Sequence, residues 1–439
     1  MKRQPGPGSH ARNIAWSLAG NVAAPVMALG TAPILAQGLG VDGRGELSAA
    51  TAPLLLAAAV GAFGLPEAVI HHTAKNYGSA RRSATIGLTL ISALGAVAAL
   101  LIFALAGPLS AGNDELKTLI RVTAAVVLPT IVLLVPRATI AGTHNWRILS
   151  IERALFGAFR LGWILFLWLT GALTPLSATI AWVVSPLVSG LVFFPVAFRT
   201  LRSAGAATDP EQVSWRIITG YGLRIWLGAL SGIVLTRISQ VLMVPLSSEA
   251  QAGLFAVAVT IGEIPLIISG AVRDVTFSTD SAMASDERLQ QTCRVTFQLT
   301  LLVSVGIGMT MSLWLPTLFG SGFVAGIPAA LIVLAATVIG SPGSVAGSGL
   351  SARGRPGLRS WSMFYGALAN LTILLLVTPR LGAVGAALSM LVGNFIAGNG
   401  NIFFLHSRFG LPWVRFVGFR REDLAVYQAL TRKLMAVVT

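Results

Sequence analysis

The chain has 439 residues, of which 54% are hydrophobic and only 11% are charged. Ordinary soluble domains carry about 25% charged residues, so this composition excludes a soluble globular protein and indicates a chain that uses lipid as its solvent. The formal net charge of +15 would suit a nucleic-acid-binding protein. The distribution of the basic residues instead favours a membrane topology, as described below.

Apolar stretches of about 20 residues recur along the chain, and this is the length that a helix needs to cross a bilayer. Strand-like alternation of polar and apolar residues is absent, and a helix satisfies its own backbone hydrogen bonds in lipid. The sequence therefore predicts an all-α polytopic membrane protein with about twelve transmembrane helices. The predicted spans are 14–39, 47–70, 84–106, 119–142, 154–171, 177–198, 221–246, 251–272, 295–315, 326–350, 361–378 and 383–405.

A polar break at 199–220 divides the predicted spans into two groups of six. Six spans per half give both halves the same orientation in the membrane. We therefore expect two six-helix halves around a central cavity. The predicted regions are a cytoplasmic N-terminal segment at 1–13, an N-terminal half at 14–198, a cytoplasmic linker at 199–220, a C-terminal half at 221–405 and a cytoplasmic basic tail at 406–439.

The basic residues are concentrated in alternate loops. On the side that holds the N-terminus lie 23 of the 31 Lys and Arg residues, and only Arg44, Lys117, Arg121 and Arg380 lie on the opposite side. Because cytoplasmic loops carry an excess of Lys and Arg, both termini are predicted in the cytoplasm, in a multi-pass protein of the cytoplasmic (inner) membrane. No nucleic-acid partner is expected. The tail at 413–439 mixes arginine with aromatic residues, which is typical of segments that contact anionic membrane lipids.

A few ionisable side chains lie within the predicted spans, where insertion costs about 2.5–3.5 kcal/mol and such groups usually face a cavity or a partner. They are Glu67, Arg137, Arg160, Arg224, Arg237 and Glu263. The first four lie within about two turns of predicted cytoplasmic ends, where a long side chain also reaches the interface without any further role. Arg237 and Glu263 lie deeper and at similar depths in adjacent antiparallel spans, so they are predicted to be able to pair.

Two interpretations of these residues stay open. Arg237 with Glu263 is either a structural ion pair, or part of a site for an anionic head group that is coupled to a titratable acid. In the second case the candidate substrate-binding residues are Arg137, Arg160, Arg224 and Arg237, since guanidinium groups bind phosphates with paired donors. Glu263 and Glu67 are then the candidate ion-coupling residues. No catalytic, cofactor-binding or metal-binding residue is predicted, and no cofactor is expected beyond a coupling proton or sodium ion.

Three parts of the sequence resemble a known family. Residues 38–48 (GLGVDGRGELS) resemble the first outer turn of Wzx-type polysaccharide flippases, in the multidrug/oligosaccharidyl-lipid/polysaccharide exporter superfamily. Residues 142–153 (GTHNWRILSIER) resemble the loop between the fourth and fifth spans. The motif GRP at 354–356, then Asn370 and PRLGAVGAAL at 379–388, is similar to the region from the tenth to the twelfth span. The chain length and the two-half layout also fit this family.

The resemblance implies a flippase that moves a polyprenyl-pyrophosphate-linked oligosaccharide from the inner to the outer leaflet by alternating access, for cell-surface polysaccharide biosynthesis. Lipid II is a related candidate substrate, and a polysaccharide polymerase complex is a candidate partner. The chain departs from the family in one place. Members often carry an acidic and then a basic residue in the seventh span, whereas 235–240 reads LTRISQ and keeps only the basic residue.

Two alternative functions stay open. A drug or cation antiporter of the same superfamily would favour an acidic site, which Arg237 argues against. A membrane polysaccharide polymerase or glycosyltransferase would need a large outer loop with acids or bases for chemistry. The longest predicted outer loop, near 107–118, offers only Asp114, Glu115 and Lys117. The sequence therefore favours a transporter over an enzyme.

Overall fold

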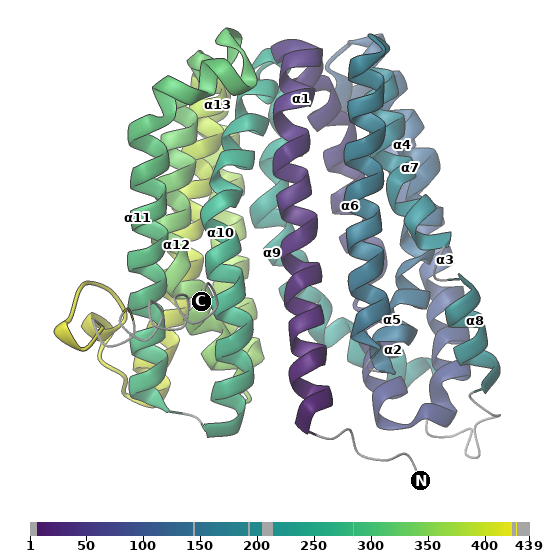
Figure 1. Ribbon diagram of the computed structural model, residues 1–439, viewed down its shortest axis with the longest axis vertical. Helices are drawn as coiled ribbons and strands as arrows, with labels where there is room; N and C mark the ends of the chain where they lie inside the picture. The colour runs from purple at the N-terminus through teal and green to yellow at the C-terminus, as the bar shows by residue number, and fades with distance from the viewer. Residues whose placement is uncertain are drawn as a thin grey trace.

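The structure is a computed structural model that describes residues 7–143, 145–191, 194–203, 214–283, 285–423 and 427. Long helices run side by side along the longest axis of the molecule (Figure 1). Within the described residues no strand occurs, and nine helices are long and apolar enough to cross a membrane. The prediction of an all-α polytopic membrane fold is confirmed, while the count of twelve spans stays a prediction.

The described helices lie before and after residues 204–213 in the sequence. In the N-terminal half they are α1 (Pro7–Ala62), α2 (Leu65–Lys75), α3 (Ala80–Ser110), α4 (Asp114–Val132), α5 (Leu134–Gly142), α6 (Trp146–Leu169), α7 (Pro175–Leu191) and α8 (Phe194–Ser203). In the C-terminal half they are α9 (Trp215–Leu246), α10 (Glu249–Met283), α11 (Asp286–Phe319), α12 (Ile327–Ala352) and α13 (Pro356–Phe409). Figure 1 shows α10 to α13 on one side of the molecule and α3 to α8 on the other, with α1 and α9 between them.

The two longest helices, α1 and α13, are helical hairpins. A straight helix of 56 residues would measure about 84 Å, far more than the roughly 30 Å of a bilayer core. Each helix contains one glycine with a positive φ, Gly40 at 68° and Gly382 at 54°, which a side chain would strain. A Cβ atom on Gly385 would lie 2.7 Å from the Cα atom of Thr378, so the chain folds back on itself at Gly382. Helix α13 thus holds two predicted spans, and α1 holds one and the first part of the next.

Two predicted spans, the first of which begins in α1, are interrupted helices. The span predicted at 47–70 is broken between α1 and α2, where Phe63 and Gly64 have φ angles of 48° and 66°. The span predicted at 119–142 is broken between α4 and α5 at Leu133. Pro136 follows within the first turn of α5 and has no N–H for a hydrogen bond to the preceding turn, which explains why the helix is interrupted there.

Several helices extend beyond the predicted spans, because polar residues continue them. Helix α1 already begins at Pro7, within the segment predicted as a cytoplasmic terminus, and residues 1–6 lie outside the described residues. The predicted linker at 199–220 is helical at both ends, and its centre at 204–213 lies outside the described residues. In the tail, 413–423 contains two short 3-10 turns, and 424–439 lies outside the described residues except for Tyr427.

Small residues allow close approach of helices in the C-terminal half. A Cβ atom on Gly343 of α12 would overlap the backbone of Gly398 in α13, and one on Gly366 would lie 2.7 Å from the carbonyl oxygen of Gly393. Small residues are the common means by which membrane helices pack through van der Waals contact and not through hydrophobic exclusion of water. The glycine-rich run at 340–349 is therefore a packing surface on α12, which holds it beside α13.

Candidate functional site

The centre of the candidate site is an ion pair between α9 and α10. The guanidinium Nη2 atom of Arg237 lies 3.3 Å from the Oε1 atom of Glu263, and its Nη1 atom donates to Gln240 Oε1 at 3.2 Å. Arg237 lies nine residues before the end of α9, which is about 14 Å along the helix. The predicted pairing at mid-depth is present. Both side chains keep access to the surroundings, with exposed fractions of 30% and 43%.

A second arginine, Arg44, belongs to the N-terminal half, and the charge of Glu263 acts on it. The charge pattern of the sequence placed Arg44 on the outer side of the membrane, and the structure buries its side chain to an exposed fraction of 8%. Its Nε atom is buried without a hydrogen bond to any described residue. We call Arg44, Arg237 and Glu263 the central charge cluster. It carries two guanidinium groups and one carboxylate, so one positive charge is in excess.

Close glycine contacts join the two halves at two levels. Near the start of α10, a Cβ atom on Gly253 would overlap the carbonyl oxygen of Val41, and one on Gly45 would lie 2.9 Å from the nitrogen of Gly253. We call this the outer glycine contact. The segments that contain these glycines therefore pack against each other directly. Because no side chain separates the two backbones, they approach each other closely.

The inner glycine contact is formed by Gly64, at the break between α1 and α2, and Gly222 of α9. A Cβ atom on Gly222 would lie 2.7 Å from the carbonyl oxygen of Phe63. Beside this contact the indole Nε1 of Trp226 donates to the carbonyl oxygens of Ala59 and Val60 at 3.3 and 3.2 Å. The carbonyl groups near the end of the second arm of α1 are thus hydrogen-bonded by the opposite half.

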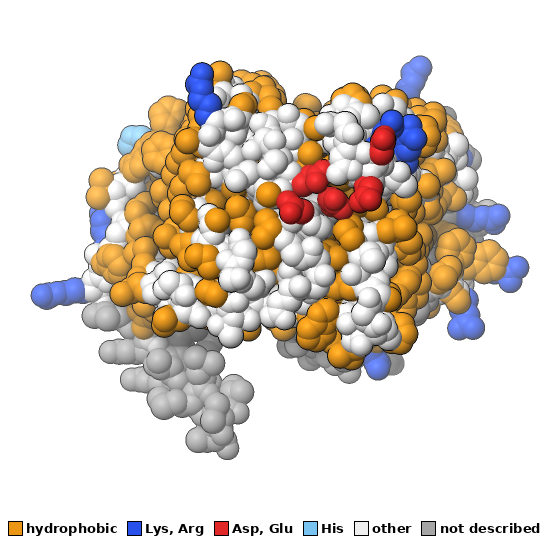
Figure 2. Space-filling model, turned by 90° about the horizontal axis from the view of Figure 1, so that it is seen from above, with side chains coloured by type: hydrophobic (Ala, Val, Ile, Leu, Met, Phe, Trp, Pro, Cys, Tyr) orange, Lys and Arg blue, Asp and Glu red, His pale blue; other side chains and the backbone are white. Residues whose placement is uncertain are grey.

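Acidic side chains gather at the predicted outer end of the bundle (Figure 2). They are Asp42, Glu46, Glu115 and Glu249. The charges of the other three act on Glu46, and Asn113 donates to Glu249 with an Nδ2–Oε1 distance of 2.5 Å. Since Glu46 belongs to α1 and Glu249 to α10, like charges repel each other across the outer glycine contact. This end of the interface combines close packing with repulsion.

The structure gives Arg137 and Arg160 separate surroundings within the N-terminal half. Arg137 of α5 forms an ion pair with Glu152 of α6, and Glu152 also accepts from the Ser189 hydroxyl at 3.2 Å. Arg160 packs between the rings of Phe156 and Trp182, with its Cζ atom 4.1 and 3.8 Å from the ring centroids. Such cation–π contacts stabilise a cation that is removed from water. Both arginines therefore have partners within the N-terminal half.

Arg160 lies farther from the start of its helix than the predicted span suggested. Because α6 begins at Trp146 and not near residue 154, Arg160 lies 14 residues into the helix, about 21 Å from its start. Its guanidinium group stacks there on Trp182.

Arg224 and Glu67 are exposed and lie near the inner glycine contact, in α9 and α2. Neither forms a salt bridge within the described residues. Arg224 is 13 residues from Arg237, about 20 Å along the same helix, so the two do not share one binding pocket. Of the predicted site residues, only Arg237 and Glu263 are brought together.

In the described part of the chain, no group of three His, Cys, Asp or Glu residues could hold a metal ion.

The sequence model of one family, described as polysaccharide biosynthesis protein, matches residues 10–277, which is more than half of the chain. No curated protein matches the chain. Among solved structures, the lipid II flippase MurJ in an inward closed conformation has a TM-score of 0.72 and 14% sequence identity, covering 92% of this chain and 89% of its own.

Two further solved structures have the same fold. An inward-facing multidrug resistance transporter of the MATE family, in the MOP superfamily, has a TM-score of 0.66 and 16% identity over 90% of this chain and 98% of its own. A MOP superfamily transporter from Pyrococcus furiosus has a TM-score of 0.64 and 15% identity over 91% of this chain and 95% of its own. At these identities the likeness concerns the fold. It agrees with the fold that the sequence resemblance implied.

Proposed function

Because the chain belongs to the polysaccharide biosynthesis protein family of the MOP superfamily, we propose that it is a flippase for a polyprenyl-pyrophosphate-linked oligosaccharide. It moves this lipid from the inner to the outer leaflet of the cytoplasmic membrane by alternating access. The multi-pass helical fold, which it shares with a lipid II flippase, supports a transporter and not an enzyme. Both termini lie in the cytoplasm, as the distribution of Lys and Arg predicts.

The observation that carries this proposal is the accessible guanidinium group of Arg237 at mid-depth of α9. A pyrophosphate is a multiply charged anion, and an arginine binds it with paired N–H donors while staying charged at any physiological pH. Arg44 adds a second cation from the opposite half, whose buried Nε atom has no partner in the described residues. An excess of positive charge favours an anionic head group over the cations that an antiporter of this superfamily would export.

The contacts between the halves support alternating access. The outer and inner glycine contacts lie at different depths, and each consists of backbone close to backbone with few interlocking side chains. Two such contacts can form and separate in turn as the halves rotate, which is the rigid-body motion of repeat-based transporters. Arg237 and Glu263 belong to one half and Arg44 to the other, so this rotation changes the distance between them. Glu263 is then the group that a coupling proton or sodium ion neutralises.

Depletion of the protein in its native cell tests the proposal. Polyprenyl-linked oligosaccharides are then quantified on each face of the inner membrane. We expect accumulation confined to the cytoplasmic leaflet. Accumulation in the outer leaflet would point to a polymerase or ligase, and an absence of accumulation together with new drug sensitivity would point to an antiporter; either outcome refutes the flippase.

Variants of the central charge cluster separate a binding site from a structural ion pair. Arg237→Ala should abolish flipping while the protein stays inserted, and Arg380→Ala, an exposed arginine at the predicted outer end, is the matched control. The double variant Arg237→Ala, Glu263→Ala removes both charges. A purely structural pair predicts that the double variant recovers activity, because no unpaired charge is left. The binding site predicts that it stays inactive.

A further inference from the structure

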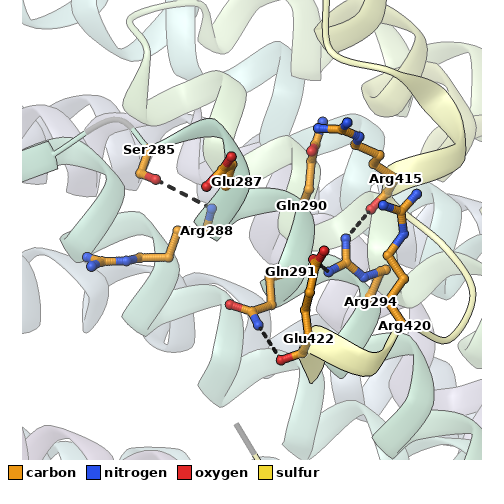
Figure 3. Close-up of a pocket in the computed structure, with 9 residues that line it drawn as sticks. All are labelled: Ser285, Glu287, Arg288, Gln290, Gln291, Arg294, Arg415, Arg420 and Glu422. Atoms are coloured by element: carbon orange, nitrogen blue, oxygen red, sulfur yellow. Dashed lines mark hydrogen bonds and ion pairs between the residues drawn. The ribbon is translucent and has the colours of Figure 1, made fainter. Parts of the chain in front are cut away.

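A polar pocket of about 530 Å³ lies at the predicted cytoplasmic end of α11, where the C-terminal tail returns against this helix. Figure 3 shows side chains of the first turns of α11 and of the tail facing each other across it. Four arginines and two glutamates are among its lining residues. The arginines are Arg288 and Arg294 of α11 and Arg415 and Arg420 of the tail. In Figure 1 the tail lies beside α11 at the edge of the bundle, away from α1.

The pocket is held in place by buried ionic contacts. Arg294 is buried, and its Nη2 atom lies 2.8 Å from Asp423 Oδ1, while its Nη1 atom donates to the carbonyl oxygen of Arg415 at 2.9 Å. Gln298 also donates to Asp423, at 2.9 Å, and accepts from the Tyr427 hydroxyl at 2.6 Å. Burial alone would raise the pKa of Asp423, but the hydrogen bonds from Arg294 and Gln298 hold it below its ordinary value. The charge of Arg294 is therefore paired with Asp423 within the protein.

The other arginines of the pocket have no such ion pair in the described part of the chain. Within the described residues, the guanidinium groups of Arg288, Arg415 and Arg420 have no hydrogen bond or ion pair. These three guanidinium groups outnumber the two carboxylates of Glu287 and Glu422, so the pocket has an excess of positive charge.

An unpaired amide points to a ligand independently of these charges. Gln290 lines the pocket and has an exposed fraction of only 3%, yet its Nε2 atom has no hydrogen-bond acceptor in the described part of the chain. A buried donor without an acceptor costs about 1–3 kcal/mol. An oxygen-rich anion in the pocket would supply the missing acceptor and also neutralise the nearby arginines.

The surroundings of the pocket indicate where this anion comes from. The tail exposes Val414 and Phe419 to fractions of 77% and 74%, next to the arginines, and Trp413 is also exposed. Aromatic and apolar side chains beside arginine are the arrangement found at the level of lipid head groups. A free phosphate would leave these apolar side chains in water, whereas a lipid covers them with its acyl chains.

We propose that the pocket between α11 and the tail binds the phosphate of an anionic lipid head group in the cytoplasmic leaflet. Arg415 and Arg420 hold the phosphate, Gln290 donates to one of its oxygens, and Val414 and Phe419 contact the acyl chains. The site is distinct from the central charge cluster. Binding there fixes the tail and the inner end of α11 at the membrane surface, whatever substrate the protein moves.

Equilibrium binding to the purified full-length protein in detergent tests this site. Fluorescent phosphatidylglycerol is the probe, and phosphatidylcholine with the same acyl chains is the zwitterionic comparison. We expect the double variant Arg415→Ala, Arg420→Ala to weaken phosphatidylglycerol binding at least about tenfold, since two cations near the phosphate are lost. The control Arg408→Ala, Arg421→Ala removes two exposed tail arginines outside the pocket and should leave binding unchanged.

Replacing Gln290 gives a second test, in which thermal stability and lipid affinity should change in opposite directions. The variant Gln290→Met removes the unpaired donor, so the lipid-free protein should unfold at a higher temperature while its affinity for phosphatidylglycerol falls. Equal losses in the pocket and control variants would overturn the proposal, because binding would then follow the total charge of the tail. Equal affinity for phosphatidylcholine would also overturn it. Displacement of the probe by millimolar inorganic phosphate would show that the occupant is a soluble anion.

Discussion

Replacing Gly253 by alanine should hold the two halves apart at the outer glycine contact. The added methyl group would lie 2.9 Å from the carbonyl carbon of Val41 and would overlap its oxygen, whereas ordinary contacts begin at 3.4 Å. The halves must therefore separate there by at least about 0.5 Å, and by more to clear the oxygen. The neighbouring atoms are backbone and cannot rotate away. Gly45→Ala meets the backbone of Glu249 and Gly253 and should have the same effect.

The size of the effect follows from the cost of overpacking. Inserting a methyl group into a close-packed contact costs about 1–3 kcal/mol. If only the closed form of the outer contact bears this cost, the ratio of closed to open molecules falls about 5- to 150-fold. Repulsion among the acidic side chains at this end acts in the same direction. Flipping should decline because one of the two alternating contacts can no longer close fully.

Thiol labelling measures this change directly. The chain has a single cysteine, the buried Cys293, so Cys293→Ser provides a background without thiols. Ser48→Cys then places one buried reporter near the outer glycine contact. A membrane-impermeant maleimide added from outside should label it faster in Gly253→Ala than in the parent. Gly306→Ala, whose Cβ atom meets nothing within 4 Å, is the control. Equal labelling rates in all three proteins would refute the reasoning.

Two further predictions concern ion pairs away from the central charge cluster. Glu152→Gln should lower the free energy of unfolding by about 1–3 kcal/mol, because it leaves the partly buried Arg137 guanidinium without its carboxylate; thermal unfolding checks this, and an unchanged stability would argue that Arg137 serves the substrate. Asp423→Ala should release the tail from Arg294 and speed its proteolysis, whereas Glu422→Gln, at an exposed and longer contact of 3.5 Å, should not. Because the pKa of Asp423 is lowered in the folded protein, the tail should stay docked as the pH falls to about 4 and be released only below it; release at neutral pH would contradict this assignment.

The membrane fold could be predicted because its main determinant is local. A bilayer demands about 20 apolar residues per helix, and this requirement can be read without knowing any contact. The pairing of Arg237 with Glu263 was also predictable, since a short turn connects two helices of known rise per residue. The hairpin turns at Gly40 and Gly382 fall between predicted spans for the same reason.

Features that depend on distant contacts could not be predicted in this way. Arg44 was assigned to the outer side because loop charges are counted by position, and nothing local shows that its side chain is buried. Glu152, the partner of Arg137, lies before the predicted fifth span, because α6 begins earlier than its apolar part. The tail pocket joins residues 294 and 423, whose proximity has no local signal.

Reconstitution of the purified protein tests the central claim most directly. Liposomes with and without the protein are loaded with a fluorescent polyprenyl-pyrophosphate-linked oligosaccharide, and the fraction accessible to an impermeant quencher is followed with time. The account predicts transfer between leaflets that requires the protein, fails in Arg237→Ala and persists in Arg380→Ala. Equal transfer by empty liposomes and by protein-containing liposomes, or full activity of Arg237→Ala, would contradict it.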